Sequence, residues 1–199
     1  MEFKTDALLL RATDYGESDK IVTLLTADRG KLTASVKGVK KAAAKLRFAA
    51  QPFCFAEYVL AARGERNTVV SASLYDGFYS LREDLPAYFS AACVTEACDR
   101  LSYEDTESGE FLVAAVTALR EMGGGDPAFA LVKFLLRALA LAGYPVTAEH
   151  CAVCGKPLAG RMCFDFSGGA FTCSECGVGV AASESTYFTI RAALGAGGE

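Results

Sequence analysis

The sequence has little of what most enzymes use for catalysis. One histidine, His150, occurs among its 199 residues, and no Ser-His-Asp set is evident around it. The G-x-x-x-x-G-K-[ST] loop that cradles nucleotide phosphates is absent as well. Four acids between positions 104 and 110 form a cluster, but such a cluster is typical of a solvated linker. We therefore predict that the protein is not an enzyme.

Long apolar runs and a secretory signal are also missing. The most apolar stretch, residues 128–142, is interrupted by Lys133 and Arg137, so no membrane span is predicted. No charged segment followed by an apolar stretch opens the chain, so we expect a cytoplasmic protein in which disulfides do not persist. A hydrophobic fraction of 52% is ample for a buried core.

Charge is divided unevenly along the chain. The net charge is −4, but residues 1–80 hold 12 Lys or Arg against 9 Asp or Glu, whereas residues 81–199 hold 8 against 15. The first part is therefore basic and the second acidic. Because binding depends on the local field over a patch, the acidic total does not argue against a polyanionic partner.

Four cysteines near the C-terminus carry the clearest motif. Cys151, Cys154, Cys173 and Cys176 form C-x2-C-x18-C-x2-C, and a glycine follows each pair. Two such pairs joined by a hairpin can surround one tetrahedral ion, and four thiolates without redox context favour zinc over iron. The motif predicts a zinc ribbon at about residues 148–180 that holds one structural zinc ion.

Two alternatives to four-sulfur ligation remain open at this point. The four cysteines could form a pair of disulfides, and Cys163 or His150 could replace one of the ligands. The four cysteines outside the motif lie among apolar neighbours and are more typical of small buried hydrophobes: Cys54, Cys93, Cys98 and Cys163.

The residue pattern of the first eighty positions predicts β-structure. Five strand-length segments are rich in Leu, Val, Thr and Phe, and turn residues separate them. Five short antiparallel strands favour a closed barrel of the OB type, with an SH3-like barrel as the competitor. The predicted strands are Thr5–Thr13, Lys20–Thr26, Lys31–Val36, Phe53–Ala61 and Thr68–Leu74.

The pattern of residues 81–199 predicts an α-helical domain that carries the ribbon. Apolar residues recur at helical spacing in 86–103 and 111–122, and Asp126-Pro127 is a typical start for a third helix, which ends near Gly143. A hairpin of 161–166 and 170–172 follows, and 192–199 read as a frayed tail. The predicted organisation is α+β and multidomain: an OB-type domain at 1–80 and a helical domain with the ribbon at 81–199.

A run of cations without any acid occupies nineteen positions of the basic part. A flexible loop of this charge density can follow a phosphate backbone, although it could also be a solubilising surface. We expect Phe48, Phe53 and Tyr15 to lie mainly in the core, so that binding depends on phosphates and weakens with salt. The run consists of Arg29, Lys31, Lys37, Lys40, Lys41, Lys45 and Arg47.

The order of these motifs resembles the RecO family of bacterial recombination mediators. The first block is Tyr15-Gly16-Glu17-x-Asp19, then Leu25-Thr26-x-Asp28-x-Gly30, Lys37-Gly38-x-Lys40-Lys41, Leu46-Arg47 and Gln51-Pro52-Phe53. The second runs from Phe134-Leu135-Leu136-Arg137 through Gly143-Tyr144-Pro145 to Cys151-x-x-Cys154-Gly155. The match spans about residues 5–180.

The resemblance implies a DNA repair protein without turnover. Such a protein binds single- and double-stranded DNA, anneals complementary strands and acts on strands coated by the single-strand DNA-binding protein. It helps a RecR-type partner load the recombinase, in the bacterial cytoplasm at the nucleoid. An RNA-binding barrel with a zinc ribbon and a protein-interaction adaptor are the alternatives. The DNA contacts implied by the resemblance fall on Lys37, Lys40, Lys41, Lys45 and Arg47.

Overall fold

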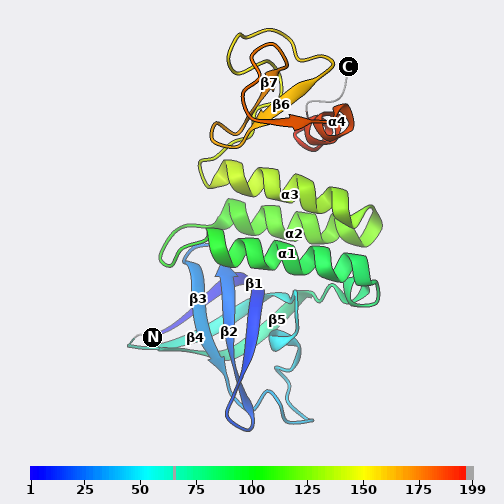
Figure 1. The fold of residues 1–199 in the computed structure, drawn as a ribbon. Coiled ribbons are helices and arrows are strands. Elements are labelled where there is room, and N and C mark those ends of the chain that lie inside the picture. Colours follow the sequence, from blue (N-terminus) through cyan, green and yellow to red (C-terminus); the bar gives the residue numbers. More distant parts are fainter. Residues whose placement is uncertain (65, 196–199) are drawn as a thin grey trace. The chain divides into compact units, whose positions relative to one another are not determined.

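The structure, a computed structural model, describes residues 1–64 and 66–195. The chain divides into two compact units, Met1–Leu131 and Val132–Glu199. The first unit holds a β-barrel and two helices, and the second holds a small three-stranded sheet and a short helix. Figure 1 labels the four helices and strands β1–β7 as they are named below.

A closed five-stranded barrel forms the N-terminal part. Its strands lie in the order β1-β2-β3-β5-β4, and β1 and β4 pair to complete the ring. Four of the pairings are antiparallel, and β3 and β5 pair in parallel through Ala34–Asn67 and Ser35–Thr68. This order confirms the predicted OB-type barrel. The strands are β1 (Glu2–Tyr15), β2 (Asp19–Thr26), β3 (Gly30–Val36), β4 (Phe55–Arg63) and β5 (Arg66–Asp76).

Strand β1 is long enough to pair with two neighbouring strands, β2 and β4. Residues 2–8 pair with β4, residues 7–15 pair with β2, and the register shifts between Leu9 and Arg11. The shift has the character of a β-bulge, which bends a strand and increases its twist. A bent first strand therefore allows five strands to close into a barrel.

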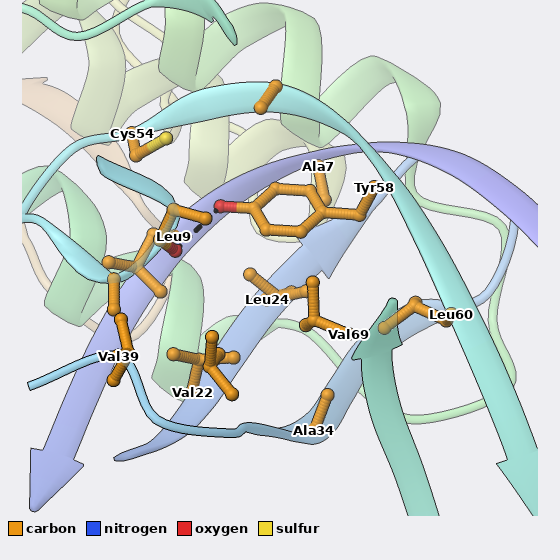
Figure 2. Close-up of a cluster of buried hydrophobic side chains, with 14 residues drawn as sticks. Ala7, Leu9, Val22, Leu24, Ala34, Val39, Cys54, Tyr58, Leu60 and Val69 are labelled. Carbon is orange, nitrogen blue, oxygen red and sulfur yellow. Dashed lines mark hydrogen bonds between the residues drawn. The ribbon is translucent and has the colours of Figure 1, made fainter. Parts of the chain in front are cut away.

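The barrel interior is filled by inward-facing apolar residues from all five strands. Figure 2 shows Tyr58 of β4 reaching across this cluster, with a hydrogen bond at its hydroxyl. The Tyr58 Oη donates to the Ala49 carbonyl at 3.0 Å, and burial raises the pKa of Tyr58 far above its ordinary value. The connection between β3 and β4, residues 37–54, is thus fastened to the core. We call it the basic loop.

The basic loop is anchored at several points, whereas the sequence predicted a flexible segment. Val39, Ala49 and Ala50 are buried in the barrel cluster, and Leu46 and Phe48 pack against it. These apolar side chains alternate with the cations in sequence, so the loop lies across the barrel with its charges outward. Its cations are therefore held in place before any ligand arrives.

Replacing Tyr58 with phenylalanine tests this anchoring. We expect the variant to lower the free energy of barrel unfolding by about 1–2 kcal/mol, because the buried Ala49 carbonyl loses its donor. Urea denaturation followed by circular dichroism would measure the loss. Tyr15→Phe, at an exposed ring, is the control. Equal stability of the two variants would show that the Tyr58 hydroxyl contributes nothing.

Two helices complete the first unit. Helix α1 (Leu85–Leu101) begins at Asp84, whose carboxylate accepts from the Ala87 amide at 2.9 Å, and α2 (Gly109–Gly124) follows. Both pack against β1, and the turn at Gly30 contacts the loop between them. Gly30 has φ +63°, and a Cβ there would lie 2.1 Å from the Tyr103 carbonyl oxygen, so no larger residue fits.

A third helix links the two units in sequence. Helix α3 (Pro127–Leu141) has Asp126 before it, and the Asp126 carboxylate accepts from the Ala128 amide at 2.9 Å. It ends before Gly143, which has φ +89°. These boundaries match the predicted ones within a few residues.

The second unit contains the predicted ribbon and two elements that the sequence did not suggest. Its sheet has the order β7-β6-β8, made of β6 (Met162–Asp165), β7 (Ala170–Cys173) and β8 (Val180–Ala182). Helix α4 (Glu184–Ala193) follows, so the predicted tail at 192–199 is helical at its start, and 196–199 lie outside the described residues. Met162, Phe171 and Tyr187 form a small core with Ala148.

Within residues 1–64 and 66–195, every helix falls short of the length and apolarity that crossing a membrane requires.

Candidate functional site

The basic run predicted from the sequence is divided by strand β3. Arg29 and Lys31 lie at its first end, where Lys31 Nζ is 3.3 Å from Asp99 of α1 and Arg29 stacks over the Phe3 ring. The other five cations follow the last residue of β3. The first of them, Lys37, is six residues beyond Lys31, which corresponds to about 20 Å along an extended strand. Arg29 and Lys31 are therefore separated from the five cations of the basic loop by the length of β3.

Those five are exposed but differ in their partners. Lys37 Nζ lies 3.9 Å from Asp19, and Lys40 Nζ donates to Asp14 at 2.7 Å. In the described part of the chain, no carboxylate lies within ion-pair distance of the side chains of Lys41, Lys45 and Arg47. The structure thus places three cations of the predicted set on the surface outside ion pairs, although the charge of Lys41 contributes to lowering the pKa of Asp19.

The β1–β2 turn fixes the start of the basic loop. The Asp19 carboxylate accepts from the Gly38 amide at 2.7 Å and from Ser18 Oγ at 3.0 Å, and the Lys40 amide donates to the Ser18 carbonyl. The Gly38 hydrogen bond is the largest cause of the lowered pKa of Asp19. Two motifs separated by about twenty residues, Tyr15–Asp19 and Lys37–Lys41, are therefore one structural feature.

A surface cavity of about 290 Å³ opens beside this feature. Within it, Asp14 Oδ2 accepts from Lys40, and Asp14 Oδ1 lies 3.8 Å from Lys20 Nζ. The Lys40 hydrogen bond holds the pKa of Asp14 below its ordinary value, so the carboxylate stays ionised at neutral pH. The cavity is lined by Asp14, Lys20, Val39, Lys40, Arg47, Ala50 and Gln51.

Sequence reasoning missed the three other polar residues that line the cavity. Asp14 and Lys20 flank the β1–β2 turn, and Gln51 belongs to the Gln51-Pro52-Phe53 motif. Their signal was weak, because a single acid and a single lysine beside a polar turn are common on any surface. Only the fold brings them to the cations of the basic loop.

The end of the basic loop is clamped by Arg82. Its guanidinium donates to the Pro52 and Gly77 carbonyls and lies 3.5 Å from Gln51 Oε1. Phe53 is buried with φ +64° and meets the Tyr88 ring edge-on, with ring centroids 5.5 Å apart. Phe53 is thus a core residue, as predicted, whereas Tyr15 is largely exposed.

The four motif cysteines converge in the second unit. Their sulfurs all lie within 4.8 Å of one another, and Cys154 and Cys173 Sγ are 3.8 Å apart. A zinc–sulfur bond of about 2.3 Å gives a tetrahedral edge of about 3.8 Å, so this spacing fits a metal centre. A disulfide would need about 2.05 Å, and all four cysteines are free thiols in the structure.

Two tight turns position these sulfurs. The Gly155 amide donates to the Cys151 carbonyl at 2.8 Å, the Gly177 amide to that of Cys173 at 3.0 Å, and both glycines have positive φ. The Cys173 amide donates to Cys151 Sγ at 3.3 Å. Neither Cys163 nor His150 belongs to the cluster of converging ligand atoms.

The ionisation of the thiols shows what the cluster requires. Hydrogen bonds from backbone amides, that of Cys154 first, lower the pKa of Cys151 to about 6. Hydrogen bonding with the neighbouring thiols, chiefly Cys173, raises the pKa of Cys176 to about 12. One thiolate is therefore favoured, and a metal ion at this position would stabilise additional thiolates.

Comparison with known proteins gives a consistent result over nearly the whole chain. The family models "Recombination protein O N terminal" and "Recombination protein O C terminal" match residues 1–78 and 82–193.

Curated relatives share this description. The chain is 34% identical over 174 residues to the DNA repair protein RecO of Pelotomaculum thermopropionicum, covering 87% of this chain and 68% of the relative. It is 33% identical to the DNA repair protein RecO of Myxococcus xanthus, and the match covers 88% of this chain and 73% of the relative. It is 35% identical to the DNA repair protein RecO of a Nocardioides species, and the match covers 92% of this chain and 78% of the relative. With an OB-type barrel, a helical part and a four-cysteine ribbon also in place, the chain belongs to the RecO family of DNA repair proteins.

Proposed function

We propose that the protein binds single- and double-stranded DNA through the basic loop and anneals complementary strands. Cations that neutralise phosphates on two strands reduce the repulsion that opposes their pairing. The proposal rests on one observation above all: Lys41, Lys45 and Arg47 are exposed, have no carboxylate at ion-pair distance among the described residues and lie on an anchored loop of a RecO-family barrel. OB-type barrels commonly bind nucleic acids.

This activity would serve a mediator role without turnover. We propose that the protein acts on strands coated by the single-strand DNA-binding protein and helps a RecR-type partner load recombinase, in the bacterial cytoplasm at the nucleoid. The helical part and the ribbon are the surfaces we assign to protein partners, with DNA-binding and partner-binding domains at 1–80 and 81–199.

The four cysteines would hold one structural zinc ion. Four thiolates fill the coordination shell of a tetrahedral ion, so no open position remains for a water or substrate. This arrangement supports a structural metal and a protein that does not catalyse a reaction.

Annealing of two complementary oligonucleotides tests the proposal directly. We expect the protein to accelerate pairing of both bare strands and strands coated by the single-strand DNA-binding protein, and the acceleration to fall between low and high ionic strength. Binding to DNA and to RNA of equal length should be compared at the same salt. A chain that leaves pairing rates unchanged at low salt, or that binds RNA in preference to DNA, would contradict the proposal.

A further inference from the structure

The surface cavity beside the basic loop contains more positive charge than its own acid can neutralise. Lys20, Lys40 and Arg47 line it together with a single carboxylate, that of Asp14. Asp14 contacts both lysines, at 2.7 and 3.8 Å, whereas no carboxylate of the described residues pairs with Arg47. The net formal charge of the lining side chains is therefore +2. Arg47 is the cation among them that an anion can reach without displacing a carboxylate.

The donors around the cavity suit an anion with several oxygens. A guanidinium offers a planar fork for two oxygens, and the two ammonium groups act as point charges at its side. Gln51 Oε1 accepts from Arg82, which leaves the Gln51 amide NH₂ as a further donor. At about 30 Å³ per water molecule, a volume of about 290 Å³ holds roughly ten waters, so a partly hydrated phosphate fits.

We propose that this cavity binds one internal phosphodiester of a nucleic-acid strand, and that Asp14 is a built-in competitor which the phosphate displaces from Lys40. This inference rests on the proposed function and adds to it a defined position on the strand and a regulating residue. The backbone would continue from the cavity to Lys41 and Lys45, which are exposed on the same loop. Lys20, from β2, thus joins the site although it lies outside the basic loop.

The sign of the effect of Asp14→Asn separates this proposal from a structural role for the ion pair. Removing a competitor frees Lys20 and Lys40, so single-stranded DNA should bind about two- to five-fold more tightly, with a steeper dependence on salt. If Asp14 only positioned the loop, the variant would bind less tightly or equally. Glu57→Gln is the matched control, because Glu57 pairs with Lys4 at 3.3 Å on the same barrel but outside the cavity.

Lys20→Ala tests the cavity from the other side. One lost phosphate contact should weaken single-strand binding about five-fold at 0.1 M salt and reduce the log–log slope by about 0.7. Lys4→Ala, which removes the same charge elsewhere on the barrel, should change neither quantity appreciably. Inorganic phosphate should raise the melting temperature of the full chain above that in chloride of equal ionic strength, and Lys20→Ala should abolish this difference.

The outcomes distinguish this proposal from the proposed function. If Lys41→Ala/Lys45→Ala weakens DNA binding while Asp14→Asn and Lys20→Ala bind as the unaltered chain does, DNA binding stands and the cavity is not its phosphate site. If the unaltered chain binds no strand at low salt, both proposals are overturned. A preference for 5′-phosphorylated over 5′-hydroxyl strands that Lys20→Ala removes would overturn the assignment to an internal phosphodiester.

Discussion

Replacing Cys173 with serine is expected to unfold the ribbon in the second unit. Binding of a structural zinc ion contributes about 10–16 kcal/mol of apparent free energy in small modules. The core around Met162, Phe171 and Tyr187 is too small to replace that contribution. Metal analysis should show loss of bound zinc, and hydrogen exchange should show loss of protection at the β6 and β7 amides. A strong chelator should produce the same changes in the unaltered chain.

The matched control for this variant is Cys163→Ser. Cys163 lies on β6, next to the same core but outside the group of four converging sulfurs. We expect the control to keep its zinc and its protected amides. Full zinc content and unchanged exchange in Cys173→Ser would show that the cluster does not hold the metal as proposed.

Removing the three unpaired cations of the basic loop is the prediction with the largest expected effect on binding. In Lys41→Ala/Lys45→Ala/Arg47→Ala, three lost phosphate contacts should reduce the log–log salt slope for single strands by about 2. The same relation gives a loss of about 100-fold in affinity at 0.1 M salt. Titration of a labelled oligonucleotide at several salt concentrations measures both quantities.

A control with the same change in net charge separates a local site from a general effect. Lys4, Arg100 and Arg120 are exposed cations on β1, α1 and α2, away from the basic loop in sequence. Replacing all three with alanine should leave the slope nearly unchanged. If both triple variants lose affinity equally, binding follows net charge and not the basic loop.

The architecture was largely predictable from the sequence because local signals agree with the fold. All five strands, three helices and the ribbon hairpin lie within a few residues of their predicted positions. The pairing of β3 with β5 was not derivable from strand positions alone, since an OB-type and an SH3-like barrel differ in how the strands meet. Strand β8 has three residues and helix α4 has ten, so both are too short for the periodic pattern that revealed the longer elements.

The site was predictable in its residue types but not in its pairings. The convergence of the four cysteines follows from their spacing, because two tight turns on a hairpin leave few other arrangements. The state of the cations depends on acids from elsewhere in the chain: Asp14 and Asp19 come from the β1–β2 turn, and Asp99 comes from α1. Charge counting along the sequence cannot reveal such partners, since they meet only after folding.

The double pairing of β1 has a consequence for how the chain folds during synthesis. Its first half carries apolar residues such as Leu8 and pairs with β4, which ends at Arg63. At about 5–20 residues per second, the ribosome needs roughly 2–7 s to make the 37 residues from the end of β2 at Thr26 to the end of β4 at Arg63. During that interval the nascent β1–β2 hairpin has an uncovered apolar edge, which is the period when a chaperone would protect it from aggregation.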